Sequence, residues 1–486
     1  MSEYKGKVLR ALSWSAGGKV FSQVISLGFG IALARMLTPD DFGLIAMMMV
    51  FTGFAALLTD VGLGSALVQK EDVTELHYNT VFWTNLGLGV ALTCIILVSS
   101  PWIATFYGRE ELTGLGYILS LQFVLGALAL VPRQRLVKSL TFKVITIADF
   151  LGMFVAGIAA IVMAKYGYEY WALAWQFVIL RVVATLYIWM SARWMPRLSF
   201  SKHALAELFG FSFYVFATRM LGYITQQADK LLAGRFLGGN AVGLLDKAQS
   251  MMLFPLSNVS HVVGSVMFPA LSMIQNDKKR VRAVYMRCTQ AIALLTFPMM
   301  AGMFAVAENF VLGVLGEQWK ELVVILRILC VAGIAISIVT VTGSVYLSQG
   351  MAKLQFKVNL LTRPIALTGV IVGLNWGVEG VAIGATVATL INTVITLRVA
   401  GGLIDLSLGT LFSSFFKTFC AAILMCIAIM ATESFVAEYP SLAQFFIQVF
   451  EGVLVYTFLV VLFRVRALED VWQIVKERLP KSSVNH

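Results

Sequence analysis

The chain is short of charged residues. Asp, Glu, Lys and Arg together make up 13% of its 486 residues, whereas 59% are hydrophobic and the mean hydropathy is +0.84. Soluble domains are about a quarter charged and roughly 45–50% apolar, so a soluble core cannot bury this excess. A helix that crosses the ~30 Å hydrocarbon layer of a membrane needs about 20 residues, or about 35 with its connection, which allows about 14 crossings. No room remains for a large soluble catalytic domain.

Motifs for several common chemistries are missing as well. The chain has no Gly-rich phosphate loop ending in Gly-Lys-Ser or Gly-Lys-Thr, no HExxH and no GxSxG, which argues against direct ATP drive and against zinc-protease or serine-hydrolase chemistry. The cysteines form no CxxC, and the histidines form no metal-ligand pair. We therefore expect no enzyme activity, no metal and no cofactor. The residues concerned are Cys94, Cys288, Cys330, Cys420, Cys426, His77, His203, His261 and His486.

The N-terminal segment has some features of a cleaved signal peptide, because basic residues precede an apolar run that ends in Ala-Leu-Ala at 32–34. A signal peptide needs a strongly apolar core. This run instead carries polar residues such as Lys19 and Gln23, and a related segment recurs later in the chain. We therefore interpret residues 11–36 as a retained transmembrane helix.

Apolar stretches of about 20 residues, separated by charged or Gly/Pro-marked breaks, predict fourteen membrane spans. They lie near 11–36, 42–66, 80–106, 112–132, 144–164, 168–190, 209–236, 241–268, 286–312, 319–347, 354–376, 378–400, 411–431 and 442–463. The spans that begin at 11, 209 and 241 are the most polar of the set.

Basic residues in the loops gather on one side of the predicted membrane. With the N-terminus inside, the outer loops hold only Arg109, Lys165 and Lys320. Positive residues accumulate in cytoplasmic loops, so both termini are predicted to be cytoplasmic. This placement also explains the net charge of +11 without a nucleic-acid partner.

An internal repeat emerges when the chain is aligned with itself at a shift of 200 residues without gaps: Arg35 meets Arg235, Gly43 meets Gly243 and Gly64 meets Gly264. Six spans separate the copies, so both copies face the same way and the repeat is parallel, with its axis along the membrane normal.

The predicted fold class is therefore all-α integral membrane, with about 14 transmembrane helices in two six-helix lobes followed by a C-terminal helix pair. The predicted division is 1–203 for the N-lobe, 204–402 for the C-lobe, and 403–486 for the last two spans with a cytoplasmic tail.

Eight charged residues lie near the middle of predicted spans. At about 3 kcal/mol for each one facing lipid, their total cost would be about 24 kcal/mol, which exceeds the roughly 5–15 kcal/mol by which proteins are usually stable. Most must therefore pair with one another or line a water-filled cavity. They are Lys19, Asp60, Arg181, Arg219, Asp229, Arg327, Arg363 and Glu451.

Helical periodicity places polar residues of the first, second, seventh and eighth spans on shared faces, from which we infer a central cavity between the lobes. The predicted cationic binding residues are Lys19, Arg219, Arg181, Arg363, Arg327 and Lys230. The predicted polar lining is Gln23, Ser26, Gln226, Ser257 and His261, and the candidates for ion coupling are Asp60, Asp229 and Glu451. The alternative is that these side chains form structural ion pairs or extend to the lipid headgroups.

Three segments resemble those of the polysaccharide-transporter (Wzx-type) flippases, which belong to the multidrug/oligosaccharidyl-lipid/polysaccharide (MOP) exporter superfamily. They are ARMLTPDDFGL at 34–44, QADKLLAGRFLG at 227–238 and MFPALS at 267–272. The resemblance covers at least 11–400 and is closest to the exopolysaccharide branch, which includes colanic-acid and teichuronic-acid exporters.

The resemblance implies a MOP/MATE-like protein of the bacterial inner membrane that moves undecaprenyl-diphosphate-linked oligosaccharide from the cytoplasmic to the periplasmic leaflet by alternating access. It also implies that spans 13 and 14 hold the polyprenyl tail, and it makes a polysaccharide polymerase a candidate partner besides the lipid bilayer. The residues agree with this cargo, because basic side chains such as Lys19 and Arg219 would replace the hydration that an anionic diphosphate loses.

Two other functions remain open at this point. An ion-coupled multidrug exporter of the same superfamily would favour acids in its cavity, whereas the mid-span set holds five bases and three acids. A membrane enzyme of glycan assembly would usually need a large outer loop with acidic residues. The outer loops are short, the longest running from about 309 to 321.

Overall fold

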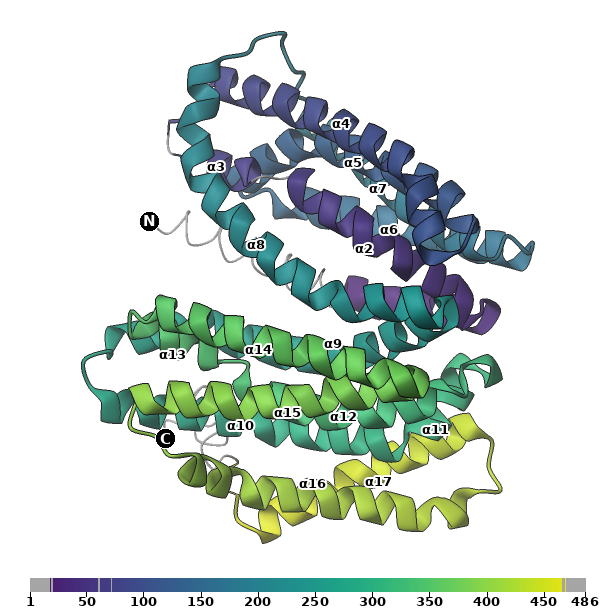
Figure 1. Ribbon diagram of the computed structural model, residues 1–486, viewed down its shortest axis with the longest axis vertical. Helices are drawn as coiled ribbons and strands as arrows, with labels where there is room; N and C mark the ends of the chain where they lie inside the picture. Colours follow the sequence, from purple (N-terminus) through teal and green to yellow (C-terminus); the bar gives the residue numbers. More distant parts are fainter. Residues whose placement is uncertain (1–17, 19–20, 60–61, 71, 466–467, 469–486) are drawn as a thin grey trace, which may run out of the picture. The chain divides into compact units, whose positions relative to one another are not determined.

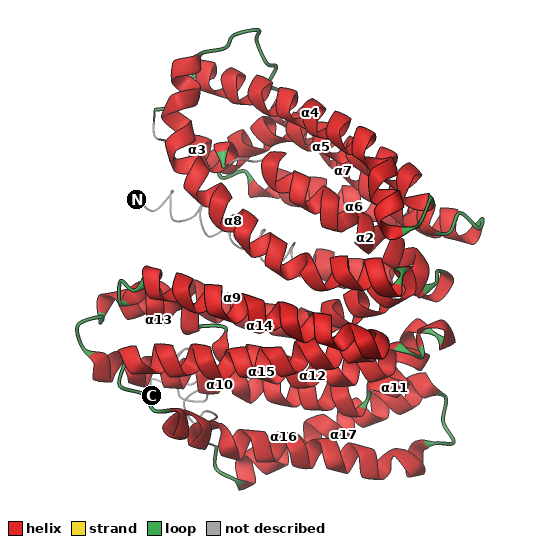
Figure 2. Cartoon of the chain, viewed as in Figure 1, coloured by secondary structure: helices red, strands yellow, loops and turns green. Residues whose placement is uncertain are grey.

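A computed structural model describes residues 18, 21–59, 62–70, 72–465 and 468; within them, the side chains at 208–219, 221–222, 224–226, 260–263 and 265–266 are not described. The described residues form helices joined by turns and short loops, and they contain no β-strand (Figure 2). A helix satisfies its own backbone hydrogen bonds, which is what an apolar chain needs where water is absent.

The helices follow one another in an order that can be traced in Figure 1. The first half comprises the helical segment Phe21–Met36, α2 (Pro39–Thr59), α3 (Leu63–Gln69), α4 (Glu75–Tyr107), α5 (Glu111–Lys138), α6 (Phe142–Lys165), α7 (Tyr170–Ala192) and α8 (Lys202–Leu237). The second half comprises α9 (Gly239–Met273), α10 (Lys278–Ala305), α11 (Ala307–Phe310), the π-helix η1 (Val311–Leu315), the 3-10 helix η2 (Glu317–Trp319), α12 (Leu322–Val339), α13 (Thr342–Ser348), α14 (Ala352–Gly373), the 3-10 helix η3 (Leu374–Trp376), α15 (Gly377–Leu403), α16 (Leu408–Val436) and α17 (Ser441–Leu462).

The predicted spans coincide with these helices, whose ends differ from the prediction by several residues. Ten helical stretches of the described residues are long and apolar enough to cross a membrane, with α14 and α15 counted as one stretch. The segment Phe21–Met36, α8 and α9 are not among the ten, and they correspond to the three polar spans. The all-helical membrane fold is therefore confirmed, whereas the number of 14 crossings is not.

The chain packs into two compact units, Met1–Gly243 and Leu244–His486. Although the repeat places α8 at the start of the second lobe, this helix packs against α2, α3 and α4 in the first unit. A boundary between repeats and a boundary between packed units are different properties of a chain. The predicted division at 203 and 402 therefore stays a prediction.

In the first unit, α4 packs along α5 and α6 packs along α7 (Figure 1). The connection from α7 to α8 is held against the start of α4 by polar contacts. Asn79 Oδ1 accepts a hydrogen bond from the Arg197 amide at 3.0 Å, and Asn79 Nδ2 donates to Ser199 Oγ at 2.9 Å. The indole of Trp83 donates to the Arg197 carbonyl oxygen at 2.9 Å. This connection is therefore a fixed part of the first unit.

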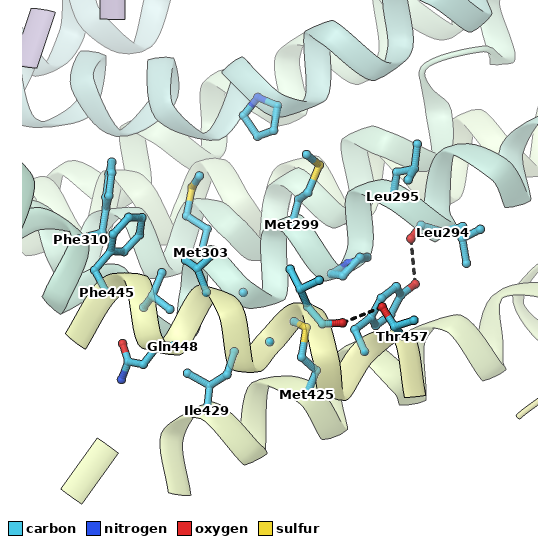
Figure 3. Close-up of a pocket in the computed structure, with 18 residues that line it drawn as sticks. Leu294, Leu295, Met299, Met303, Phe310, Met425, Ile429, Phe445, Gln448 and Thr457 are labelled. Atoms are coloured by element: carbon cyan, nitrogen blue, oxygen red, sulfur yellow. Dashed lines mark hydrogen bonds between the residues drawn. The ribbon is translucent and has the colours of Figure 1, made fainter. Parts of the chain in front are cut away.

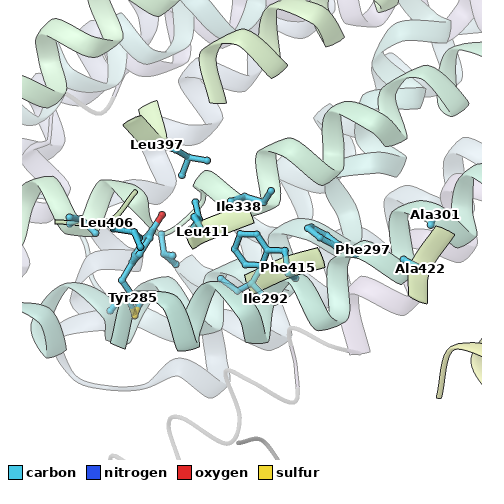
Figure 4. Close-up of a cluster of buried hydrophobic side chains, with 14 of the residues drawn as sticks. Tyr285, Ile292, Phe297, Ala301, Ile338, Leu397, Leu406, Leu411, Phe415 and Ala422 are labelled. Atoms are coloured by element: carbon cyan, nitrogen blue, oxygen red, sulfur yellow. The ribbon is translucent and has the colours of Figure 1, made fainter. Parts of the chain in front are cut away.

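In the second unit, a core of buried apolar side chains lies among α10, α12, α15 and α16 (Figure 4). Phe297 of α10 and Phe415 of α16 are buried at its centre, with ring centroids 6.1 Å apart in an edge-to-face arrangement. Tyr285 is also buried, and its hydroxyl is 2.9 Å from the hydroxyl of Thr342. The two phenylalanine rings thus pack α16 against α10, and the contact between Tyr285 and Thr342 joins α10 to α13.

Glycines allow α14 and α15 to approach each other closely. A Cβ added at Gly373 would overlap the carbonyl oxygen of Gly380, and a Cβ added at Gly384 would overlap that of Gly369. Each helix carries its two glycines four residues apart, the small-residue spacing that lets membrane helices pack by van der Waals contact. The pair is therefore held by close backbone packing and not by the hydrophobic effect, which is absent between helices in lipid.

Candidate functional site

Several predicted site residues lie outside the described part of the protein. Lys19 and Asp60 belong to undescribed positions, and the side chains of Arg219, Gln226 and His261 are also not described. The cationic face predicted for the first span and its repeat therefore stays a prediction at these positions.

Arg181 is an exposed cation midway along α7. It lies close enough to Arg133 of α5 and Asp149 of α6 to interact with them electrostatically. Those two residues already pair in a fork, with Nη1–Oδ1 at 2.8 Å and Nη2–Oδ2 at 2.7 Å, the strongest geometry for this pair. In the described part of the chain, no ion pair joins Arg181 to a carboxylate. The role of Arg181 as a cationic binding residue therefore stays a prediction.

The predicted polar face of α8 is partly engaged with α2. Tyr223 donates a hydrogen bond from its hydroxyl to the carbonyl oxygen of Met49 at 2.8 Å. Lys230 and Asp229 are half-buried, and Asp229 Oδ1 accepts a hydrogen bond from the Lys230 amide at 2.9 Å. The polar residues of the first span that the structure describes are Gln23, which is half-buried, and Ser26, which is exposed.

Arg327 has partners within the protein. Its Nη2 lies 3.6 Å from Glu308 Oε2, and its Nε donates to the Phe304 carbonyl oxygen at 3.4 Å. These contacts connect α12 to the end of α10 and to α11. The geometry favours a structural role for Arg327, which is the alternative that the sequence left open.

The other predicted residues of the second unit are dispersed. Arg363 is half-buried on α14, and Ser257 is exposed on α9, where its hydroxyl donates to the Phe254 carbonyl oxygen at 3.2 Å. Glu451 of α17 accepts a hydrogen bond from Thr432 of α16 at 2.7 Å. We find these three side chains on different helices, with no contact that joins them among the described residues.

The second unit contains a cavity of about 510 Å³, here called the apolar groove (Figure 3). It is open on one side, and its size falls in the range of ligand sites, about 300–1,000 Å³. Its walls come mainly from α10, α16 and α17, with one residue each from α9 and α11 and with Val306 from the junction of α10 and α11, and nearly all of the lining residues are apolar. The lining residues are Pro255, Leu294, Leu295, Pro298, Met299, Gly302, Met303, Val306, Phe310, Met425, Ile429, Phe445, Gln448, Val449, Gly452, Val453, Tyr456 and Thr457.

Hydrogen bonds and aromatic contacts fix the two ends of the apolar groove. At one end, the Phe310 and Phe445 rings lie 5.4 Å apart, and Gln448 accepts a hydrogen bond from Asn309 at 3.0 Å. At the other end, the Tyr456 hydroxyl donates to the Leu294 carbonyl oxygen at 2.8 Å (Figure 3). Both polar side chains are satisfied by protein groups, so the space between them presents apolar surface.

The sequence prediction assigned the last two spans to a lipid tail by resemblance, but it did not include the residues of α10 among the site. A four-residue spacing of Leu294, Pro298, Gly302 and Val306 along α10 was the available signal. Residues that face lipid and residues that face a groove are equally apolar, so hydropathy cannot separate them. Among the described residues, no group of three His, Cys, Asp or Glu side chains could hold a metal ion.

Comparison with known proteins adds to this geometry. A family model described as "Polysaccharide biosynthesis protein" matches residues 32–325. The chain is 28% identical over 468 residues to the teichuronic acid biosynthesis protein TuaB of Bacillus subtilis, covering 94% of this chain and 95% of that protein. It is 29% identical over 314 residues to the succinoglycan biosynthesis transport protein ExoT of Rhizobium meliloti, covering 64% and 63% of the two chains.

Among solved structures, the inward closed conformation of the lipid II flippase MurJ is similar to most of this chain. The TM-score is 0.74 at 14% identity, with 93% of this chain and 99% of that chain covered. At this identity the likeness concerns the fold. It supports the MOP-type fold expected from the sequence, in a multi-pass membrane protein.

Proposed function

Because the chain belongs to the polysaccharide biosynthesis protein family, we propose that it translocates lipid-linked oligosaccharide precursors of a surface polysaccharide across the membrane. TuaB and ExoT are named for polysaccharide biosynthesis, and ExoT is named as a transport protein. Translocation needs no covalent step, so the proposed protein is a transporter and not an enzyme.

The apolar groove is the observation that carries this proposal. A lipid-linked sugar has a long apolar chain and a polar head, and the head must cross the membrane while the chain stays in it. A groove of about 510 Å³ lined by α10, α16 and α17 can hold a segment of such a chain. A small, water-soluble substrate would gain little from binding in a site whose lining is almost entirely apolar.

We propose that the anionic head is held by the cationic residues inferred from the sequence. Arg181 is the best supported of the described set, because it is exposed and no carboxylate among the described residues pairs with it. Lys19, Arg219, Lys230 and Arg363 complete the proposed set. A charge-assisted hydrogen bond to phosphate is about twice as strong as a neutral one, and this would offset part of the desolvation of the head.

The finer features stay part of the proposal. The cargo is an undecaprenyl-diphosphate oligosaccharide, the membrane is a bacterial inner membrane, both termini are cytoplasmic, and a polysaccharide polymerase takes over the flipped cargo.

Glu451, Asp229 and Asp60 are the proposed positions of ion coupling. A translocation rate that is indifferent to membrane potential and pH gradient would remove the coupling from this proposal.

Reconstituted translocation tests the proposal directly. Proteoliposomes would carry a fluorescent polyprenyl-diphosphate oligosaccharide on one side, and a membrane-impermeant quencher would report protein-dependent access of the head to the other side. We expect access for this lipid and none for a cationic dye. Movement of the dye alone would make the protein a drug exporter instead.

Substitutions of basic residues test whether the proposed cations hold the anionic head. Lys19→Gln combined with Arg219→Gln should abolish access of the head while leaving protein levels in the membrane unchanged. Lys353→Gln combined with Lys357→Gln removes two exposed cations of α14 and serves as the control for lost charge. Normal translocation by the first double variant would contradict the cationic site.

A further inference from the structure

A second cavity of the same unit lies beside the same three helices. This polar cavity has a volume of about 380 Å³ and is lined by Met286, Gln290, Thr410, Ser413, Ser414, Lys417, Thr418, Arg464 and Val465. Its residues come from α10, from the first turns of α16 and from the chain just after α17. Two cations and several hydroxyl and amide groups line it, in contrast to the apolar groove.

The two cavities follow one another along the length of α10. Met286 and Gln290 line the polar cavity, and Leu294, Pro298, Gly302 and Val306 line the apolar groove, each four residues after the last. Residues four apart lie one above the other on a helix, so the step from Gln290 to Leu294 is about 6 Å along the axis. One small buried cluster connects the cavities, because it contains both Leu294 of the groove and Val465 of the polar cavity.

The charges of the polar cavity are not balanced by the described protein. Lys417 Nζ donates to the carbonyl oxygen of Phe463 at 2.9 Å, at the end of α17. Lys417 and Arg464 are both exposed, and no carboxylate in the described residues forms an ion pair with either. The backbone of Arg464 is held just after α17, where its φ is 46° and its amide donates to the Val461 carbonyl oxygen at 3.1 Å.

The start of α16 adds to the positive potential. Ser407 caps this 29-residue helix by accepting a hydrogen bond from the Thr410 amide at 3.2 Å. The partial positive charge of a helix N-terminus favours anions, and Thr410 and Ser413 lie within its first two turns. The cavity therefore combines two cations, a helix N-terminus and hydroxyl groups, which together suit a phosphate.

The preference of this unit for one lipid over the surrounding lipids must come mainly from the head of that lipid. Lipid tails are as apolar as the groove, so a tail that leaves the bilayer for the groove gains packing but no hydrophobic driving force. A phosphate that meets Lys417 and Arg464 gains charge-assisted hydrogen bonds, which are stronger than hydrogen bonds between neutral groups. A cationic pocket next to an apolar groove is thus the arrangement that selects an amphiphile with a phosphate at its head.

We propose that the polar cavity binds the phosphate groups of a lipid whose chain lies in the apolar groove, and that it is the site where lipid-linked cargo first docks. The inference rests on the proposed function and on the predicted orientation, which places the start of α16 and the end of α17 on the cytoplasmic side. The cargo is assembled on that side, so a docking site there precedes translocation. Polyprenyl diphosphates and ordinary anionic phospholipids share the required chemistry.

Binding measurements on the full-length protein in phosphatidylcholine nanodiscs separate these sources. The probes are farnesyl diphosphate, phosphatidic acid and inorganic diphosphate. We expect farnesyl diphosphate to bind more tightly than the other two. Lys417→Gln combined with Arg464→Gln should weaken its binding at least about tenfold, whereas Lys353→Gln combined with Lys357→Gln should change it less than about twofold.

A variant of the apolar groove tests the serial arrangement. Val453 lines the groove and its side chain is exposed, so Val453→Trp narrows the groove with little effect on folding. We expect this change to weaken farnesyl diphosphate and to leave inorganic diphosphate unaffected. Equal loss for both probes, or loss for neither, would overturn the arrangement of head and chain.

The remaining outcomes are also decisive. Unchanged farnesyl diphosphate binding in the Lys417 and Arg464 double variant would overturn the site. Binding of phosphatidic acid that is as tight and as sensitive to the double variant would assign the cavity to membrane phospholipid and overturn the docking role. Wild-type protein that fails to translocate in proteoliposomes would overturn the proposed function, whatever the binding results.

Discussion

Gly43, in the first turns of α2, lies against Gly239, the first residue of α9, with no room for a side chain between them. A Cβ added at Gly43 would overlap the carbonyl oxygen of Gly239. The reciprocal contact is also present, since a Cβ added at Gly243 would overlap the carbonyl oxygen of Pro39. All four residues belong to the first compact unit.

These two contacts bear on the internal repeat. At the shift of 200 residues, position 39 corresponds to 239 and position 43 corresponds to 243. Exchanging the two copies of the repeat therefore turns the contact between 43 and 239 into the contact between 243 and 39, which is the pattern of a twofold relation between equivalent segments. The identity between Gly43 and Gly243 therefore has a physical reason: the backbones approach so closely at both positions that only glycine fits.

Replacing Gly43 should therefore destabilise the protein. Gly43→Ala pushes a methyl group into a backbone oxygen that cannot rotate away, and overpacking of this kind costs about 1–3 kcal/mol. Gly87→Ala in α4 is the matched control, because nothing lies within 4 Å of its added Cβ; there the free energy of unfolding should rise by up to about 1 kcal/mol. Thermal or denaturant unfolding in detergent measures the stability of both variants. An equal change in the free energy of unfolding for Gly43→Ala and Gly87→Ala would contradict the close approach of the two backbones.

Arg327 and Glu308 should behave as a structural pair. Arg327→Gln leaves Glu308 without its partner, and we expect it to lower the free energy of unfolding by about 0.5–1 kcal/mol, since both side chains are partly exposed. Adding Glu308→Gln should recover most of the lost free energy of unfolding, and the double variant should translocate cargo like the wild type. A double variant that is as stable as the wild type but does not translocate cargo would mean that Arg327 binds cargo and is not only part of a structural pair.

Glu207, near the start of α8 and before the predicted span, makes the stability of the first unit depend on pH. Lys70 pairs with its carboxylate, His77 Nε2 lies 3.3 Å away and His203 Nδ1 lies 2.7 Å away. The hydrogen bonds from Lys70 and then His77 lower the pKa of Glu207 to about 2. The stabilisation is therefore present above the unfolded pKa of about 4.3 and is lost as pH falls toward 2.

The corresponding variant is Glu207→Gln. At pH 6 it should unfold at a slightly lower temperature than the wild type, and this difference should shrink as pH falls below about 4.3. Glu438→Gln, at an exposed position just after α16, is the matched control and should show no such trend. A difference that stays constant from pH 6 to pH 3 would mean that the carboxylate charge does not stabilise the fold.

The sequence predicted the helices well, because a membrane forces each crossing to be long and apolar. The predicted span 80–106, for example, lies within α4. It could not predict that Arg327 pairs with Glu308, because that contact depends on how α11 and α12 pack after they form. Nor could it separate Met299 of the apolar groove from a lipid-facing methionine. Both the partners of polar side chains and the walls of a groove are set by how the helices pack, and hydropathy carries no information about that packing.

Arg181 offers the sharpest test of the cationic site. Arg181→Gln breaks no ion pair in the described structure and removes a like charge near Arg133, so the free energy of unfolding should stay the same or rise slightly. Translocation should fall about tenfold or more if this cation holds the anionic head. Arg133→Gln is the contrasting variant, because it separates the fork with Asp149 and should cost about 1 kcal/mol of stability. Wild-type translocation by Arg181→Gln would remove this residue from the site.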